Sequence, residues 1–168
     1  MKKNKLILIV IFLLIITGCG HKKPNKDVIK SSDDLNNKAG SITCSRKANA
    51  DSGVTPSFSY NITYRDGKIL VLHSIEKIAS NDTNYLDQYE QAYKNINTNY
   101  KDLEYYDSKV LRTDNSVTRD TTINYEKIDT DKLLSIEGEE DNIIKNGKAD
   151  LNTWLSFAKK FGTICHED

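Results

Sequence analysis

Three cysteines and three histidines are the residues of this sequence with the greatest capacity for chemistry. A thiol can take a lipid, form a disulfide or bind a metal, and an imidazole can act as a base or a metal ligand. Cys19 follows an apolar run and two small residues, Thr17 and Gly18, whereas Cys44 and Cys165 lie near the two ends of the remaining chain. Their positions therefore favour one use for Cys19 and another for the other two.

The first 18 residues have the make-up of a secretory signal peptide. Three lysines precede an unbroken apolar run that extends from Leu6 to Ile16. This run has eleven residues, whereas a membrane-spanning helix needs about 20. A charged start followed by a short apolar run is typical of a cleaved leader. We therefore predict that residues 1–18 are a signal peptide and not a permanent membrane span.

The four residues Ile16-Thr17-Gly18-Cys19 resemble the lipobox of bacterial lipoproteins, in which an aliphatic residue and two small residues precede a cysteine. The resemblance implies transfer of diacylglycerol to the Cys19 thiol and cleavage just before it. The acyl chains would contribute about 0.8 kcal/mol per buried methylene, enough for stable anchoring. We expect a protein that is bound to the cell membrane through this N-terminal lipid, on its extracytoplasmic face.

Cys44 and Cys165 form a natural pair once Cys19 is assigned to lipid. In the oxidising surroundings of an exported protein, two thiols tend to form a disulfide. This bond would close a loop of about 120 residues, worth roughly 5 kcal/mol in the chain-entropy model. Two reduced cysteines remain an alternative, as does a metal site with His166, although the cysteines lack a CxxC spacing. We predict the disulfide, with no metal and no cofactor.

The remaining residues give little support for catalysis. His21 lies in polar sequence after Cys19, and His73 shares its strand parity with apolar neighbours, as a packed or edge residue would. No nucleophile elbow, phosphate-binding loop, zinc-protease motif or dinucleotide motif occurs. Acidic residues gather at 137–141, but the segment EGEEDN lacks the ligand alternation of a calcium loop. We therefore predict that the protein is not an enzyme.

Composition and charge restrict the partners. Removal of the leader leaves 150 residues, which suits one domain. The leader takes three lysines with it, so the 24 basic residues fall to 21 against 24 acidic ones. Such an evenly mixed, mildly acidic surface argues against nucleic acid. Richness in Asn, Lys, Ile, Asp and Tyr resembles the proteins of low-GC Gram-positive bacteria.

Residues 19–40 are polar, with Pro24, paired serines and clusters of Lys and Asp. They have too little apolar surface to offset the entropy lost on ordering. We predict that they form a lipid-anchored flexible tether. Residues 41–168 then constitute the extracytoplasmic domain.

Strand periodicity dominates the first part of this domain. Residues 41–48 predict a short strand and residues 49–56 a loop. Alternating apolar residues at 58–64, the turn signal Asp66-Gly67 and an apolar partner at 68–78 predict a hairpin. A second hairpin is predicted at 105–113 and 116–127, although Arg119 and Thr121 interrupt its apolar face.

Helical periodicity appears at 82–103, with Asn81 or Asp82 as N-cap, and at 150–161, with Gly162 as the stop. A short helical turn is predicted at 129–136 and an acidic loop at 137–147. The sum is an α+β domain: an antiparallel sheet of four or five strands with two amphipathic helices on one face.

Tyrosines supply the candidate ligand-binding residues. Tyr85, Tyr89 and Tyr93 share one face of the first helix, and Tyr60 and Tyr64 share one face of a strand. In one interpretation the rings pack between helix and sheet as ordinary core residues. In the other they line a groove for a peptide, a glycan or an apolar ligand. The sequence leaves both open.

The order of these features resembles small lipoproteins of Gram-positive bacteria, and its layout is similar to that of YehR-type lipoproteins of unknown function. The matching elements are Cys19, Cys44, the hairpin turn at Asp66-Gly67 and Cys165. The resemblance implies a location and a layout but no activity. We expect a membrane-anchored surface lipoprotein that acts as a non-enzymatic binding or interaction module for a cell-envelope protein, peptide or glycan. The alternative is a small-ligand-binding lipoprotein with a tyrosine-lined pocket.

Overall fold

The computed structural model describes residues 35–48, 53–139 and 142–168. The predicted leader, the lipobox with Cys19 and most of the predicted tether lie outside these residues. Among the helices that are described, none has the length and apolar character needed to cross a membrane.

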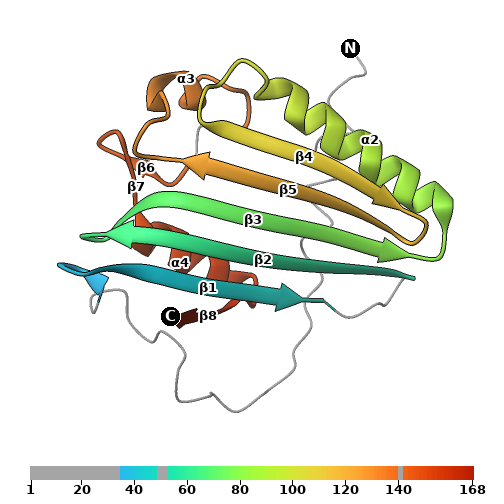
Figure 1. The fold of residues 1–168 in the computed structure, drawn as a ribbon, viewed down its shortest axis with the longest axis horizontal. Coiled ribbons are helices and arrows are strands. Elements are labelled where there is room, and N and C mark those ends of the chain that lie inside the picture. The colour runs from blue at the N-terminus through green and yellow to red at the C-terminus, as the bar shows by residue number, and fades with distance from the viewer. Residues whose placement is uncertain (1–34, 49–52, 140–141) are drawn as a thin grey trace.

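A six-stranded antiparallel sheet in the order β4-β5-β3-β2-β1-β8 forms the body of the domain (Figure 1). Its strands are β1 (Ala39–Lys47), β2 (Val54–Arg65), β3 (Lys68–Ser80), β4 (Tyr106–Thr113), β5 (Ser116–Asn124) and β8 (Ile164–Glu167). β6 (Ile144–Lys145), inside the predicted acidic loop 137–147, and β7 (Lys148–Ala149), directly after it, form a separate two-stranded sheet.

The main sheet is larger than the four or five strands predicted. The additional strand is β8, which has only four residues and pairs with β1 from Ile42 to Ser45. So short a segment carries little periodicity of its own, and its pairing with β1 makes it a strand. The antiparallel α+β class is confirmed.

Both predicted hairpins are present, and β3 of the first pairs with β5 of the second. The turn between β2 and β3 has Asp66 at φ 50° and Gly67 at φ 68°, the left-handed pair that the sequence Asp-Gly favours. β2 begins at Val54, inside the predicted loop 49–56, so Pro56 is a strand residue. β1 ends opposite Ser57, so Pro56 is at the margin of the sheet, where a missing N–H is tolerated.

The described residues contain three helices: α2 (Thr83–Asn99), α3 (Thr130–Leu134) and α4 (Leu151–Lys160). Asp82 caps α2 by accepting a hydrogen bond from the Asn84 N–H, and Asp150 caps α4 in the same way from the Thr153 N–H. α2 and α4 are the two predicted amphipathic helices, and α3 is the predicted short turn.

α2 and α4 pack on the same face of the sheet, which we call the helix side (Figure 1). Leu72 and Ile78 point to this face from β3. Leu72 belongs to a core cluster with Trp154 of α4, and Ile78 to a second cluster with Leu86 of α2. A third, smaller cluster lies around Leu133 of α3.

The packed domain includes residues before the predicted domain boundary at residue 41. Leu35 is 1% exposed and belongs to the α4 cluster. Gly40 lies so close to Tyr64 that an added Cβ would be 3.1 Å from the tyrosine hydroxyl. Residues 35–40 are therefore part of the packed domain.

The opposite face of the sheet, here called the outer face, is covered by no helix among the described residues (Figure 1). Strand alternation places mostly hydroxyl and amide side chains on this face. None of its residues belongs to a described core cluster. The two faces of one sheet therefore differ in composition and in cover.

Candidate functional site

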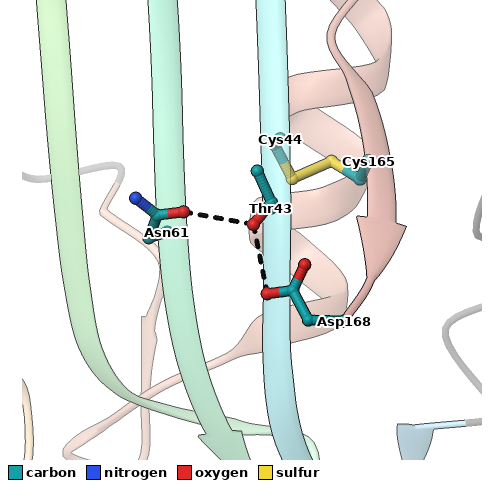
Figure 2. The surroundings of a disulfide bond; sticks show 5 residues. All are labelled: Thr43, Cys44, Asn61, Cys165 and Asp168. Atoms are coloured by element: carbon teal, nitrogen blue, oxygen red, sulfur yellow. Dashed lines mark hydrogen bonds between the residues drawn. A yellow bond between two sulfur atoms is a disulfide. The ribbon is translucent and has the colours of Figure 1, made fainter.

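Cys44 of β1 and Cys165 of β8 are direct cross-strand neighbours and form the predicted disulfide (Figure 2). Their side chains lie on the helix side, and the residues are 0% and 7% exposed. The bond joins positions 121 residues apart and holds β8 to the sheet. The prediction is confirmed, and both thiols are used. In the described part of the chain, no group of three or more His, Cys, Asp or Glu residues could hold a metal ion.

On the outer face, Asp168 is held against β1 beside the disulfide (Figure 2). The Thr43 hydroxyl lies 3.1 Å from Asp168 Oδ2 and 3.1 Å from Asn61 Oδ1. The Ser41 hydroxyl donates to the same Asp168 oxygen at 3.0 Å. Hydroxyl groups on the outer face thus bind a carboxylate of this chain.

The five candidate tyrosines are distributed over two core clusters and the surface. Tyr64 is 1% exposed in the α4 cluster, and Tyr60 stands edge-on to Trp154 at 5.1 Å between ring centroids. Tyr93 is 5% exposed in the α2 cluster, Tyr89 packs partly against it, and Tyr85 is 43% exposed. Burial, and then a hydrogen bond to Glu167, raises the pKa of Tyr64 to about 12. Tyr93 lies near both Tyr60 and Tyr89, and Tyr89 lies near Tyr85.

Tyr60 and Tyr93 lie beside a polar cluster that the sequence analysis missed. Arg119 of β5 forms an ion pair with Glu76 of β3 at 3.6 Å, with side-chain exposures of 12% and 24%. The guanidinium also donates to Asn97 Oδ1 at 3.0 Å and to the Tyr106 hydroxyl at 2.5 Å. These bonds tie α2 to the middle strands of the sheet.

The electrostatics of this cluster follow from its burial. Desolvation raises the pKa of the Glu76 carboxyl, and the Arg119 charge opposes that rise. Desolvation, and then the Glu76 charge, raises the pKa of the Tyr60 and Tyr93 phenols. Since all the guanidinium nitrogens are engaged, the cluster is organised to hold the core together. Its signal in the sequence was the polar interruption at Arg119 and Thr121.

His73 and Asp120 form a pair in the middle of the outer face, with Nε2 2.8 Å from Oδ1. Their side chains are 34% and 40% exposed. Within the described residues, no hydroxyl or thiol is hydrogen-bonded to this imidazole. The pair therefore lacks the positioned nucleophile of a hydrolytic triad.

A hollow of about 550 Å³ lies on the outer face where β8, β1, β2 and β3 adjoin. Lys47, Ser57 and Lys77 form one cross-strand row in it, so a lysine stands on each side of the serine. The next row of lining residues is Ile164, Ser45, Ser59 and Ile75. Its volume falls within the range of small-molecule sites, roughly 300–1,000 Å³.

The hollow is electropositive. Neither Lys47 nor Lys77 forms an ion pair or a side-chain hydrogen bond with any described residue. The hydroxyls of Ser45, Ser57 and Ser59 are equally free of bonds to the described part of the chain. No carboxylate from the described residues lines the hollow. Two unpaired ammonium groups and three free hydroxyls can together receive an anion.

No protein-family model and no curated protein matches this chain. Among solved structures, the NMR structure of the YehR protein of E. coli matches with a TM-score of 0.51 at 19% sequence identity, over 77% of this chain and 91% of that one. A protein from Streptococcus pneumoniae matches with a TM-score of 0.45 at 19% identity, over 91% of this chain and 98% of that one. The first match supports the YehR-like layout that the sequence predicted, at the level of the fold.

Proposed function

We propose that this protein is a lipid-anchored bacterial surface protein of a low-GC Gram-positive type, whose domain binds a ligand without chemical conversion. The lipobox resemblance at Cys19 supports the anchor. A buried disulfide suits an oxidising, extracytoplasmic setting.

The outer face of the sheet carries this proposal. An antiparallel sheet commonly buries one face and leaves the other exposed to solvent. Exposure to solvent alone does not explain a hollow in that face. Here the hollow brings together unpaired lysines and free serines from three adjacent strands. These residues stabilise no described core cluster, so their arrangement fits a role in binding.

The anchor is tested by metabolic labelling of cells with an alkyne-bearing fatty acid. The wild-type chain should take up the label, and Cys19→Ala should lose it and leave the membrane fraction. Cys44→Ala is the matched control, since it changes another cysteine and should keep the label. Label that persists in Cys19→Ala would contradict the proposed anchor.

The binding face is tested by photocross-linking in living cells. A photoreactive residue in place of Thr118, which stands beside Lys77 on the outer face, should give a discrete adduct. The same residue in place of Thr98, exposed on α2, should give none. Equal adducts from both positions would contradict the assignment of binding to the outer face.

A second candidate function is small-ligand binding at the tyrosines of the helix side. One observation favours it: the Tyr60 and Tyr93 hydroxyls make no hydrogen bond to any described residue, although both rings adjoin Glu76. Tyr93→Phe discriminates between the two sites. It should abolish binding by a helix-side ligand and leave an outer-face ligand unaffected.

A further inference from the structure

We propose that the hollow on the outer face binds the phosphate group of a small phosphate monoester, with the anion above Ser57 between Lys47 and Lys77. This inference rests on the proposed binding function and names the ligand class of that site.

The geometry of the row places two positive charges around one point. Neighbouring strands lie about 4.8 Å apart, so Lys47 on β1 and Lys77 on β3 are separated by roughly 10 Å of sheet with Ser57 midway. Each lysine has a flexible four-carbon stem and three donor hydrogens. Both ammonium groups can therefore approach a single anion above the Ser57 hydroxyl.

The charge of the ligand follows from the charge of the site. Arg46 also lines the hollow, but its guanidinium lies over the Phe58 ring at 5.7 Å, on the helix side. The two unpaired lysines therefore offer two positive charges on the outer face, and no described carboxylate in the hollow offsets them. A carboxylate would neutralise only one of these charges. A phosphate monoester carries about −1.5 to −2 near pH 7 and presents three acceptor oxygens. It matches two ammonium groups and one hydroxyl in charge and in number of contacts.

The second row of lining residues indicates which chemical groups the organic part of the ligand would carry. Ser45 and Ser59 face one another across β1 and β2 and offer two hydroxyls. Ile75 and Ile164 lie at the two ends of this row, and Ile164 is 51% exposed. A short polyol or sugar, with hydroxyls along its edge and carbon atoms against the isoleucines, suits this mixture.

A membrane surface fits the outer face less well than a small ligand does. Beyond the hollow the same face carries Asp107, Asp120 and Asp168, with side-chain exposures of 74% and 40% for the first two. A sheet of anionic headgroups would meet these carboxylates as well as the lysines. Lys109 on this face is ion-paired with Asp107, and Asp120 is paired with His73. The two lysines without an ion pair to a described residue lie in the hollow, where a small anion can reach them.

The test is calorimetric titration of residues 19–168 carrying Cys19→Ala, a form that keeps every described residue and cannot receive lipid. The probes are sn-glycerol 3-phosphate, inorganic phosphate, glycerol and acetate, at low ionic strength. We expect glycerol phosphate to bind, inorganic phosphate to bind more weakly, and glycerol and acetate to give no heat. Binding should weaken as salt rises from about 0.01 M to about 0.15 M, because screening shortens the reach of the charges.

Variants locate the site. Lys47→Gln with Lys77→Gln should weaken binding of glycerol phosphate about tenfold or more, since both charges are removed. Lys101→Gln with Lys109→Gln removes the same charge from exposed positions outside the hollow and should change the affinity less than about twofold. Ser57→Ala keeps all charges and should cause a smaller, several-fold loss. All substitutions are on the surface, and circular dichroism verifies the fold.

Three results would overturn the inference: no binding of glycerol phosphate by the unsubstituted chain, equal losses in both double variants, or sedimentation with phosphatidylglycerol vesicles without binding of the free ester. Cross-linking from position 118 in cells distinguishes this failure from failure of the proposed function. An adduct there without phosphate binding leaves the binding role in place and removes only the ligand class.

Discussion

The two faces of the sheet differ in what covers them and in how their polar side chains are bonded. The helix side is closed by α2 and α4 and contains the disulfide and the Glu76–Arg119 pair, whose guanidinium is also hydrogen-bonded to Asn97 and Tyr106. The outer face has neither helix nor apolar cluster among the described residues, and its lysines and serines are left unpaired around the hollow. If the outer face binds a ligand as proposed, substitutions there should change binding and leave stability nearly unchanged, because adjacent residues of one strand point to opposite faces.

The largest expected effect comes from the disulfide on the helix side. Cys44→Ala with Cys165→Ala should lower the free energy of unfolding by about 4 kcal/mol, because the unfolded chain loses a cross-link spanning 121 residues. Urea denaturation measures it. Reduction of the unsubstituted chain should give a similar loss, and a loss below about 1 kcal/mol would show that the bond contributes little to this face.

The next effect concerns the buried ion pair. Arg119→Met should cost about 2–3 kcal/mol, because it leaves the Glu76 carboxylate without its counter-charge. The double variant Glu76→Leu with Arg119→Met should recover most of that loss. Urea denaturation of both variants measures the difference. A double variant as unstable as the single one would show that packing, and not the unpaired charge, explains the loss.

A pH dependence follows from Asp150 at the start of α4. Burial alone would raise the pKa of this carboxyl, but hydrogen bonds from Thr153, Lys145 and Lys68 outweigh it and lower the pKa to about 2. The native state therefore holds the ionised form more strongly than the unfolded chain does. The resulting stability, about 1–2 kcal/mol, is complete above pH 4 and is lost as the pH falls toward 2.

Unfolding of the wild type and of Asp150→Asn across this acid range measures the effect. The variant should be less stable near neutral pH, and the difference should shrink as the acid protonates Asp150 in the wild type. Glu126→Gln, at an exposed position, is the control and should leave the acid dependence unchanged. A constant difference between wild type and Asp150→Asn would contradict the assignment.

The smallest effect compares two adjacent threonines directly. Thr121 faces the helix side, is 4% exposed and shares a hydrogen bond of 2.8 Å with Ser108, whereas Thr122 faces outward. Thr121→Val should cost about 1 kcal/mol through the lost hydrogen bond. Thr122→Val should stay within about 0.5 kcal/mol of the wild type. Thermal denaturation measures both variants. If both lose the same stability, the two faces of β5 do not differ as proposed.

Much of the fold could be predicted from the sequence because its signals are local. The Asp66-Gly67 turn, the helical period of α2 and the cap at Asp150 depend only on neighbours along the chain. The pairing of Cys44 with Cys165 followed from counting thiols. β8 could not be recognised as a strand, since its four residues depend on a partner in β1.

The candidate site was harder to predict. Lys47, Ser57 and Lys77 come from three strands, and nothing short of the strand register shows that they stand in one row. On the helix side, Arg119 seemed to interrupt an apolar face because the sequence cannot show that Glu76 lies opposite it. The spacing of the tyrosines indicated which of them share a face of a helix or strand. It could not show that the Tyr64 ring is buried and the Tyr85 ring is exposed.

The pairing of β8 with β1 also sets an order of events. β8 lies about 120 residues after its partner strand β1 in the sequence. Because the chain is synthesised from its amino end, β1 emerges before β8. Until Cys165 follows, one edge of β1 has no partner strand and Cys44 cannot form its disulfide. An unpaired edge invites pairing with another chain. Completion of this sheet therefore has to wait for arrival of nearly the whole domain, and oxidation of the thiols is the last covalent step that closes it.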